Sequence, residues 1–378
     1  MIRSRNTNKN TNKNRSRSSR NSSRYGRKGV FLLVLAMLLT LGLSGCGKES
    51  VDSTGAEARS ESAVFRFQGQ DVTLGEVYLY ALPVIEDYEK SYGKDIWNMT
   101  VTVGDDQKQD MKTVTRKDVI ENIVKVKVLV SKAASYKVSL TVEEKQDAED
   151  ETEAFWKNLT DRQIAEMELT RDLVYKCMTE NRLAAKVYDA IMEEAGIEIS
   201  DEEARETTFY DLYFPTYKET ANGTAKPMGD AEKSEQYDKA VQAYNSLITP
   251  MDENVTRDPA ALATYYGLTN ASYYTMTPEE VRDTYGKDIA DMLYTLEDGS
   301  CSLVTETEYG YHIFYMKALT DRTATDKKKS RIERERRNSY FSTRFAGWLK
   351  DLDANYHYED SVDFSVYDRI KFQNAATA

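Results

Sequence analysis

The side chains best suited to acid–base or nucleophilic chemistry are few in this chain. It has two histidines, His312 and His357, and three cysteines, Cys46, Cys177 and Cys301. Neither set has the spacing of a metal site. The sequence also contains no Gly-x-Ser-x-Gly and no His-Glu-x-x-His motif, which removes the common hydrolase and protease classes. We therefore expect no metal and no cofactor.

His312 stands in the most informative run of the chain, residues 290–313. A helix ending in aromatic-x-Leu is followed by a turn at Gly299, a Ser-x-x-Val segment from Ser302, and Gly-Tyr-His-Ile from Gly310. The order and spacing of these landmarks resemble the C-terminal half of a parvulin-type peptidyl-prolyl isomerase domain. Only the combination is specific, because a lone histidine on a strand is more often a core or surface residue.

The resemblance implies a set of site residues. His312 matches the histidine on the last strand of the family, and Thr307 matches the hydroxyl residue five positions before it. Ile289 and Tyr285 fall where the family has apolar residues of the proline pocket. Asp211 stands on the first strand, where the family has a second histidine. We expect His312, Asp211 and Thr307 as catalytic side chains, with Ile289 and Tyr285 binding substrate.

The implied reaction is cis/trans isomerisation of X-Pro bonds, which is slow because its barrier is about 18–20 kcal/mol. No covalent intermediate is needed, since the site has only to prefer the twisted amide over the planar forms. The aspartate leaves two alternatives open. Asp211 hydrogen-bonds His312 and fixes its tautomer, or it is a surface acid on a domain that has weak or no isomerase activity.

The N-terminus looks like an export signal. Residues 1–28 contain ten Lys or Arg and no acid, and the apolar stretch 29–43 is 15 residues long, too short to span a bilayer as a helix. Leu43-Ser-Gly-Cys46 resembles the lipobox of bacterial lipoproteins, in which the cysteine is lipidated. We expect lipidation at Cys46 and a protein anchored outside the bacterial cell membrane.

Together the lipobox and the isomerase-like motif resemble the PrsA and SurA class of extracytoplasmic foldases. The resemblance implies an α+β fold, with a helical chaperone domain made from N- and C-terminal segments. A parvulin-like small antiparallel sheet wrapped by helices is inserted between them. The expected divisions are a signal peptide at 1–45, a tether at 46–62, a helical chaperone region at 63–204, a divergent parvulin-like domain at 205–320, a returning C-terminal helix at 321–358 and a tail at 359–378.

Hydrophobic periodicity predicts the elements that carry these residues. The alternating valines of 120–130 also fit a strand, and a helix is preferred there on length, with an N-cap at Thr115. The middle of the parvulin-like domain, 250–285, is left without a firm placement. We expect a hairpin at 64–72, a strand-like insertion at 96–111, strands at 209–214, 301–304 and 309–317, and helices at 74–92, 120–130, 141–156, 161–192, 232–247, 259–266, 279–296 and 326–352.

Composition limits the partners. The net charge is −12, but residues 46–378 carry 41 basic and 63 acidic residues, a net charge of about −22. Nucleic-acid binding needs clustered Lys and Arg, and the basic run 327–337 is interrupted by glutamates, which favours a solvated helix face. We expect unfolded or partly folded exported polypeptides as partners and no nucleic acid, with a homodimer left open.

Two other classes share the anchor. A solute-binding lipoprotein of a transporter would show repeated strand–helix units in two lobes, and this chain shows helix blocks around one short sheet. An envelope lipoprotein without binding activity is the other alternative.

Overall fold

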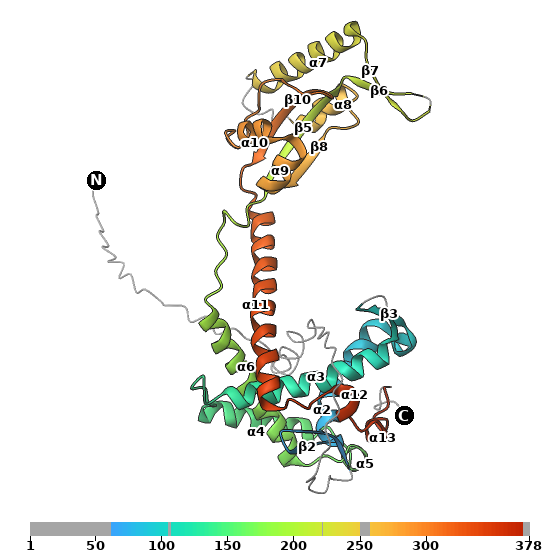
Figure 1. The fold of residues 1–378 in the computed structure, drawn as a ribbon, viewed down its shortest axis with the longest axis vertical. Coiled ribbons are helices and arrows are strands. Elements are labelled where there is room, and N and C mark those ends of the chain that lie inside the picture. Colours follow the sequence, from blue (N-terminus) through green and yellow to red (C-terminus); the bar gives the residue numbers. More distant parts are fainter. Residues whose placement is uncertain (1–61, 105–106, 221, 250–257, 373–378) are drawn as a thin grey trace, which may run out of the picture. The chain divides into compact units, whose positions relative to one another are not determined.

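A computed structural model describes residues 62–104, 107–220, 222–249 and 258–372 (Figure 1). Helices and small antiparallel sheets make up the chain, which confirms the prediction of a mixed α+β protein. Two compact units are present: unit 1 contains Met1–Ala190 and Gly347–Ala378, and unit 2 contains Ile191–Ala346. The predicted signal peptide, Cys46 and all but the last residue of the predicted tether lie outside the described residues.

Unit 1 begins with the predicted hairpin, β1 (Ala63–Phe67) and β2 (Gln70–Thr73). The two turn residues, Gln68 and Gly69, have φ angles of 51° and 74°. Two positive φ angles match the twist of a tight antiparallel hairpin. Helix α2 (Leu74–Tyr92) follows at once, capped by the hydroxyl of Thr73.

The insertion after α2 forms η1 (Lys94–Asn98), β3 (Thr100–Val103) and β4 (Gln107–Asp110). Helix α3 (Met111–Lys132) then starts earlier than predicted, because Asp110 caps it by accepting the N–H of Thr113 at 2.8 Å. The predicted N-cap, Thr115, is buried on the body of the helix. The valines of α3 alternate because the helix is buried around much of its circumference, so a strand-like pattern occurs in a helix.

The helix predicted at 141–156 is α4 (Val142–Trp156), which Thr141 and Glu144 cap reciprocally. The single helix predicted at 161–192 is two helices, α5 (Asp161–Glu166) and α6 (Arg171–Ala195). Glu168 between them has a φ of 54°, and Thr170 caps the second helix by accepting the N–H of Leu173 at 3.1 Å. Helix α6 ends three residues after the predicted bound of 192, just before Gly196, whose φ is 56°.

The last residues of the chain pack into unit 1. Helices α12 (Tyr358–Ser361) and α13 (Phe364–Tyr367) come after the helix predicted at 326–352. Tyr367 is fully buried, and its hydroxyl donates to the carbonyl of Arg116 at 2.9 Å. Phe372 packs edge-on against Trp97. Residues 362–372, expected to be tail, therefore contribute to the core of unit 1.

Unit 2 is built on one four-stranded antiparallel sheet with the order β8-β5-β10-β9. The long central strands are β5 (Thr207–Pro215) and β10 (Gly310–Ala318), and the edges are β8 (Ser272–Met276) and β9 (Thr305–Glu306). The predicted strand at 301–304 is wrong: Cys301 makes only an isolated bridge to Tyr315, and β9 begins after it. Strand β8 was missed because it lies in the stretch that the sequence left without a firm placement.

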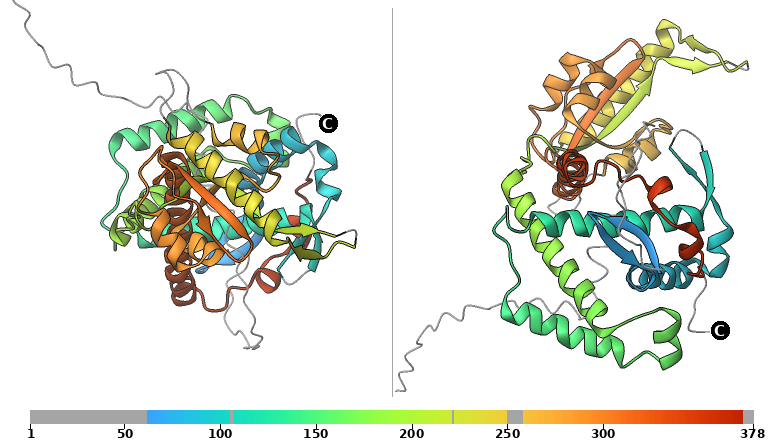
Figure 2. Two further views of the ribbon diagram at one scale, coloured as in Figure 1. Left: turned by 90° about the horizontal axis from the view of Figure 1, so that it is seen from above. Right: turned by 60° about the horizontal axis from the view of Figure 1, so that its bottom comes forward.

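Each face of this sheet has its own apolar cluster. Helices α7 (Asp230–Ile248) and α8 (Pro259–Tyr265) cover one face (Figure 2). Tyr210, Leu212 and Phe214 of β5 belong to the apolar cluster on that face. The opposite face carries Phe209 and Phe314, covered by α9 (Pro278–Tyr285) and α10 (Lys287–Leu293). Side chains alternate between faces along a strand, so a run such as Thr207–Pro215 is buried nearly throughout.

The helix predicted at 279–296 is broken in two, α9 (Pro278–Tyr285) and α10 (Lys287–Leu293). Gly286 ends the first with a φ of 83°, which glycine adopts without strain. A small hairpin, β6 (Tyr217–Glu219) and β7 (Ala225–Pro227), lies between the predicted strand at 209–214 and the predicted helix at 232–247, where no element was expected.

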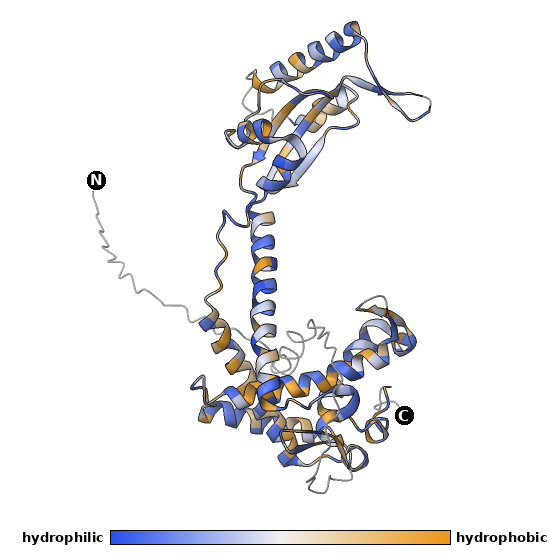
Figure 3. Cartoon of the chain, in the orientation of Figure 1, coloured by the Kyte–Doolittle hydropathy of each residue, from blue (hydrophilic) through white to orange (hydrophobic). Residues whose placement is uncertain are grey.

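Helix α11 (Arg322–Leu352) is the long predicted helix, and Figure 3 shows it as mostly hydrophilic. Its basic stretch was expected to be a solvated face. In unit 2, however, Lys328 lies 3.2 Å from Glu206, and both side chains are largely buried. Further ion pairs join α11 to residues 194–206: Arg322 and Lys329 with Asp201, Arg336 with Glu203, and Arg344 with Glu194. These cations are thus matched by acids of the same unit.

No helix within the described ranges is both long enough and apolar enough to cross a membrane.

Candidate active site

The register of the two central strands places His312 and Asp211 on one face of the sheet. His312 on β10 is opposite Tyr213 on β5, and Asp211 is opposite Phe314. Opposed residues and residues two apart along a strand point to the same side. These four side chains therefore share the face that α9 and α10 cover.

His312 and Asp211 are hydrogen-bonded and buried. Nδ1 of His312 lies 2.9 Å from Oδ1 and 3.1 Å from Oδ2 of Asp211. Only 8% of His312 and 4% of Asp211 is exposed. An ionised carboxylate can only accept a hydrogen bond, so Nδ1 is the donor and Asp211 fixes the proton on that nitrogen.

Thr307, in the turn before β10, holds the other imidazole nitrogen. Its Oγ1 lies 3.1 Å from Nε2 of His312 and 3.2 Å from the carbonyl of Gly310, and it accepts the N–H of Tyr309 at 3.3 Å. With a neutral imidazole the hydroxyl donates to Nε2. With a charged imidazole it accepts from Nε2 and donates to Gly310. Rotation of one hydroxyl therefore satisfies both protonation states of His312.

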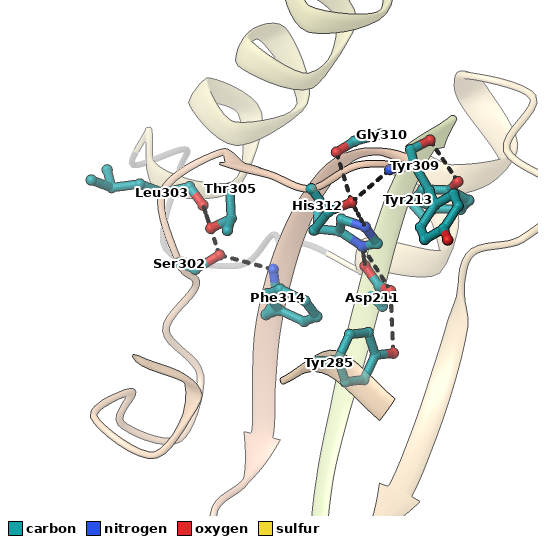
Figure 4. Close-up of polar contacts among 11 residues, drawn as sticks. Asp211, Tyr213, Tyr285, Ser302, Leu303, Thr305, Tyr309, Gly310, His312 and Phe314 are labelled. Atoms are coloured by element: carbon teal, nitrogen blue, oxygen red, sulfur yellow. Dashed lines mark hydrogen bonds and ion pairs between the residues drawn. The ribbon is translucent and has the colours of Figure 1, made fainter. Parts of the chain in front are cut away.

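Tyr285, the last residue of α9, reaches the same carboxylate. Its hydroxyl donates to Oδ2 of Asp211 at 3.3 Å, so Asp211 lies between His312 and Tyr285 (Figure 4). Burial, followed by the negative charge of Asp211, raises the pKa of Tyr285 well above its ordinary value. The phenol thus stays protonated and remains a donor.

Aromatic rings enclose the imidazole. Tyr213 stacks on His312 with a centroid distance of 4.6 Å, and the ring of Phe314 is parallel to the imidazole at a centroid distance of 5.5 Å. The hydroxyl of Tyr213 donates to the carbonyl of Tyr309 at 2.8 Å, which ties β5 to the turn that carries Thr307. The imidazole is therefore held by both hydrogen bonds and ring packing.

Ser302 fixes the segment in front of β9 to the site strand. Its N–H donates to the carbonyl of Phe314 at 2.8 Å, and its Oγ accepts the N–H of Phe314 at 3.0 Å. These two bonds join the start of the Ser-x-x-Val segment to the backbone of β10, two residues after His312.

The structure brings together four of the residues that the sequence predicted: His312, Asp211, Thr307 and Tyr285. Ile289 on α10 packs against the apolar cluster of Phe209 and Phe314, on the same face of the sheet. Cys46, the predicted lipidation site, lies outside the described residues.

Sequence reasoning missed Tyr213 and Ser302. Tyr213 had a usable signal, because it lies two residues after Asp211 on a strand and must share its face. Ser302 had been noted only as a landmark of the motif.

The cysteines and acids of the described residues offer no second reactive centre. Cys177 and Cys301 are both free, and burial raises the pKa of each thiol, most strongly that of Cys177. No group of three or more His, Cys, Asp and Glu side chains in this part of the chain is placed to hold a metal ion.

The comparison with known proteins gives a relative of similar length. No protein-family model matches the chain. Foldase protein PrsA from two strains of Clostridium perfringens is 24% identical over 349 residues, covering 88% of this chain and 96% of the relative. This chain is similar to PrsA foldases. The resemblance to a PrsA-like foldase that the sequence predicted is thus confirmed.

Solved PrsA structures also match. Coverage of this chain is 82% for PrsA of Bacillus subtilis, 64% for that of Bacillus anthracis and 72% for that of Bacillus cereus, at 13%, 16% and 14% identity. The TM-scores are 0.18, 0.20 and 0.20, so the arrangement of this chain is not inferred from these structures.

Proposed function

We propose that this protein is an extracytoplasmic foldase, anchored by a lipid on Cys46, that binds unfolded or partly folded exported polypeptides. The observation that carries the proposal is the similarity to proteins named foldase PrsA, which extends over 88% of the chain and therefore over both units. An isomerase fragment alone would match only one of them.

The proposed architecture is a helical chaperone region split in sequence by a parvulin-like insert. The chaperone region would comprise residues 63–204 and 321–358, extended by the packed residues 362–372, and the insert residues 205–320. Division of the chain into a discontinuous unit 1 and a continuous unit 2 supports this nesting. The antiparallel sheet of unit 2, covered by helices on both faces, supports the insert.

A light-scattering assay tests the chaperone function. The full chain, purified in mild detergent, should slow aggregation of an unfolded exported protein diluted from denaturant, at several-fold molar excess of the chain. An acidic protein with no foldase activity, added at the same concentration, is the control for crowding and charge. Aggregation at the control rate would overturn the proposal.

The anchor has a separate test. Cys46→Ala removes the thiol that the lipid would modify, so the variant should leave the membrane fraction and appear in the medium of a producing bacterium. Cys301→Ala is the matched control, because that cysteine lies on unit 2 and should not affect anchoring. Equal membrane retention of both variants would contradict lipidation at Cys46.

Isomerisation of X-Pro bonds is a second function, favoured by the buried network of His312, Asp211, Thr307 and Tyr285. We propose that unit 2 presents this network to a proline peptide and stabilises the twisted amide. The network would supply fixed hydrogen-bonding groups in an apolar surrounding, where they act more strongly than in water.

Exchange spectroscopy on a proline peptide measures this activity directly. The full chain should accelerate cis/trans exchange, and His312→Ala should abolish the acceleration. His357→Ala is the matched control, since His357 is exposed and lies in unit 1. If the exchange rate with the wild-type chain equals the rate in buffer, the isomerase function is contradicted and only the chaperone function remains proposed.

A further inference from the structure

The contact between Tyr285 and Asp211 gives Tyr285 a role that its position in the sequence did not suggest. The family resemblance implied an apolar wall of a proline pocket. The structure instead places the phenol hydroxyl 3.3 Å from Oδ2 of Asp211 (Figure 4). The carboxylate is 4% exposed, so this donor is one of a small number that can reach it.

Asp211 needs such a donor to hold one orientation. The terminal torsion of an aspartate is broad, because it joins an sp³ carbon to an sp² carbon. Nδ1 of His312 is almost equally far from the two oxygens, at 2.9 and 3.1 Å, and does not select between rotations of the carboxylate. The hydroxyl of Tyr285 reaches only Oδ2 and breaks this near-symmetry.

The position of Tyr285 is itself fixed by the fold. It is the last residue of α9, and Gly286 then reverses the backbone with a φ of 83°. Its ring packs edge-on against Phe314 at 5.2 Å and against Phe209 at 5.9 Å. The hydroxyl is therefore held by a helix end and by packing against two rings, and the Tyr285 ring also lies edge-on to the imidazole of His312 at 6.3 Å.

We propose that Tyr285 is a positioning residue for His312. Its hydroxyl fixes the rotation of the Asp211 carboxylate, and Asp211 in turn holds the imidazole through Nδ1. The consequence for catalysis rests on the proposed isomerase function, whereas the consequence for the geometry of His312 does not.

Nitrogen-15 labelling of histidine in the full chain tests the geometric part. With two histidines in the chain, His357 is an internal reference for the signals of His312. Tyr285→Phe keeps the ring and removes the hydroxyl. We expect the Nδ1–H of His312 to exchange with solvent about five- to tenfold faster, the size of effect that follows from losing one hydrogen bond.

Tyr294→Phe is the matched control, because Tyr294 packs against the same apolar cluster and has no contact with Asp211 among those described. Exchange at the wild-type rate in Tyr285→Phe would overturn the proposal. Failure of Tyr285→Phe to fold would overturn it as well, because a hydroxyl needed for folding is structural.

A kinetic measurement tests the catalytic part. If the wild-type chain catalyses isomerisation, Tyr285→Phe should lower kcat with little change in KM, because the aromatic ring and its packing are kept and only the positioning hydroxyl is lost. A wild-type chain without isomerase activity refutes the proposed reaction, and the exchange measurement then still decides whether Tyr285 positions His312.

Discussion

Unit 1 joins three helices by a set of four charges around buried Glu76 and Lys127, whereas the candidate site of unit 2 pairs buried Asp211 with an imidazole on the neighbouring strand. In unit 1, Glu76 of α2 lies 2.6 Å from the amine of Lys127 on α3, and Lys127 lies 3.3 Å from Glu180 on α6. Lys176 completes the set at 3.7 Å from Glu76 and 3.8 Å from Glu180. Each charge thus has two partners of opposite sign.

The two clusters differ in whether their hydrogen bonds can adapt to a change of protonation state. Burial alone would lower the pKa of Lys127, but Glu76 and Glu180 together raise it above its ordinary value, so the amine stays charged. In unit 2, by contrast, the hydroxyl of Thr307 can serve a neutral or a charged His312 by turning. The paired charges of unit 1 hold its helices together. In unit 2, the hydrogen bonds among Asp211, His312 and Thr307 can be kept when a proton is gained or lost at the imidazole.

Removing one charge from unit 1 should have the largest effect. Lys127→Met leaves Glu76 buried without its nearest cation, and breaking a buried pair in this way costs about 3–5 kcal/mol of unfolding free energy. Denaturant unfolding followed by tryptophan fluorescence measures it. Lys112→Met, an exposed lysine of the same helix, is the control and should change stability by less than about 0.5 kcal/mol.

A small effect of Lys127→Met, similar to that of Lys112→Met, would remove the distinction between the two clusters. The charges of unit 1 would then be replaceable, as some buried ion pairs are.

A methyl group at Gly310 tests how tightly unit 2 holds its site. A Cβ there would overlap the carbonyl oxygen of Phe214 and lie 2.8 Å from the ring of Tyr213. Gly310→Ala should therefore separate β10 from β5 next to His312 and destabilise unit 2 by about 1–3 kcal/mol. The Nε2 signal of His312 should move as well, because Gly310 accepts the N–H of Thr307.

Gly347→Ala is the matched control for the same substitution. Its Cβ would meet nothing within 4 Å, and it lies inside α11. Alanine should stabilise that helix by about 0.5–1 kcal/mol. If both variants change stability in the same direction, packing around Gly310 is looser than the geometry indicates.

The smallest effect is expected from the exposed ion pairs of unit 2. Hydrogen bonds from Lys329 and then from Arg322 lower the pKa of Asp201 from 3.8 to about 2. A depressed carboxyl pKa stabilises the folded state above the ordinary pKa, and this contribution is lost as pH falls through about 2. Exposed pairs contribute little and are screened by salt.

Carbon-13 NMR of the Asp201 carboxyl, followed as pH is lowered, measures this pKa. It should rise towards its ordinary value at high salt. A titration at 3.8 in low salt would show that the pairs along α11 do not hold in solution.

Much of the local structure followed from sequence pattern. The hairpin at Gln68-Gly69, the helix after Thr73 and the end of α6 before Gly196 all depend on residues close together in the chain. The breaks at Glu168 and Gly286 were missed because the apolar spacing continues across them. A single residue with a positive φ can interrupt a helix without interrupting its periodicity.

The sequence by itself determined the mixture of helices and antiparallel strands, the resemblance to PrsA-like foldases and the identities of His312, Asp211 and Thr307. The mixture of elements follows from composition and short-range pattern, whereas the three site residues are what the resemblance carried by residues 290–313 and the lipobox implies. Only the tertiary structure decided that Asp211 faces His312 and that the hydroxyl of Tyr285 reaches the same carboxylate. The register between β5 and β10 joins residues 101 positions apart, and no local pattern specifies it.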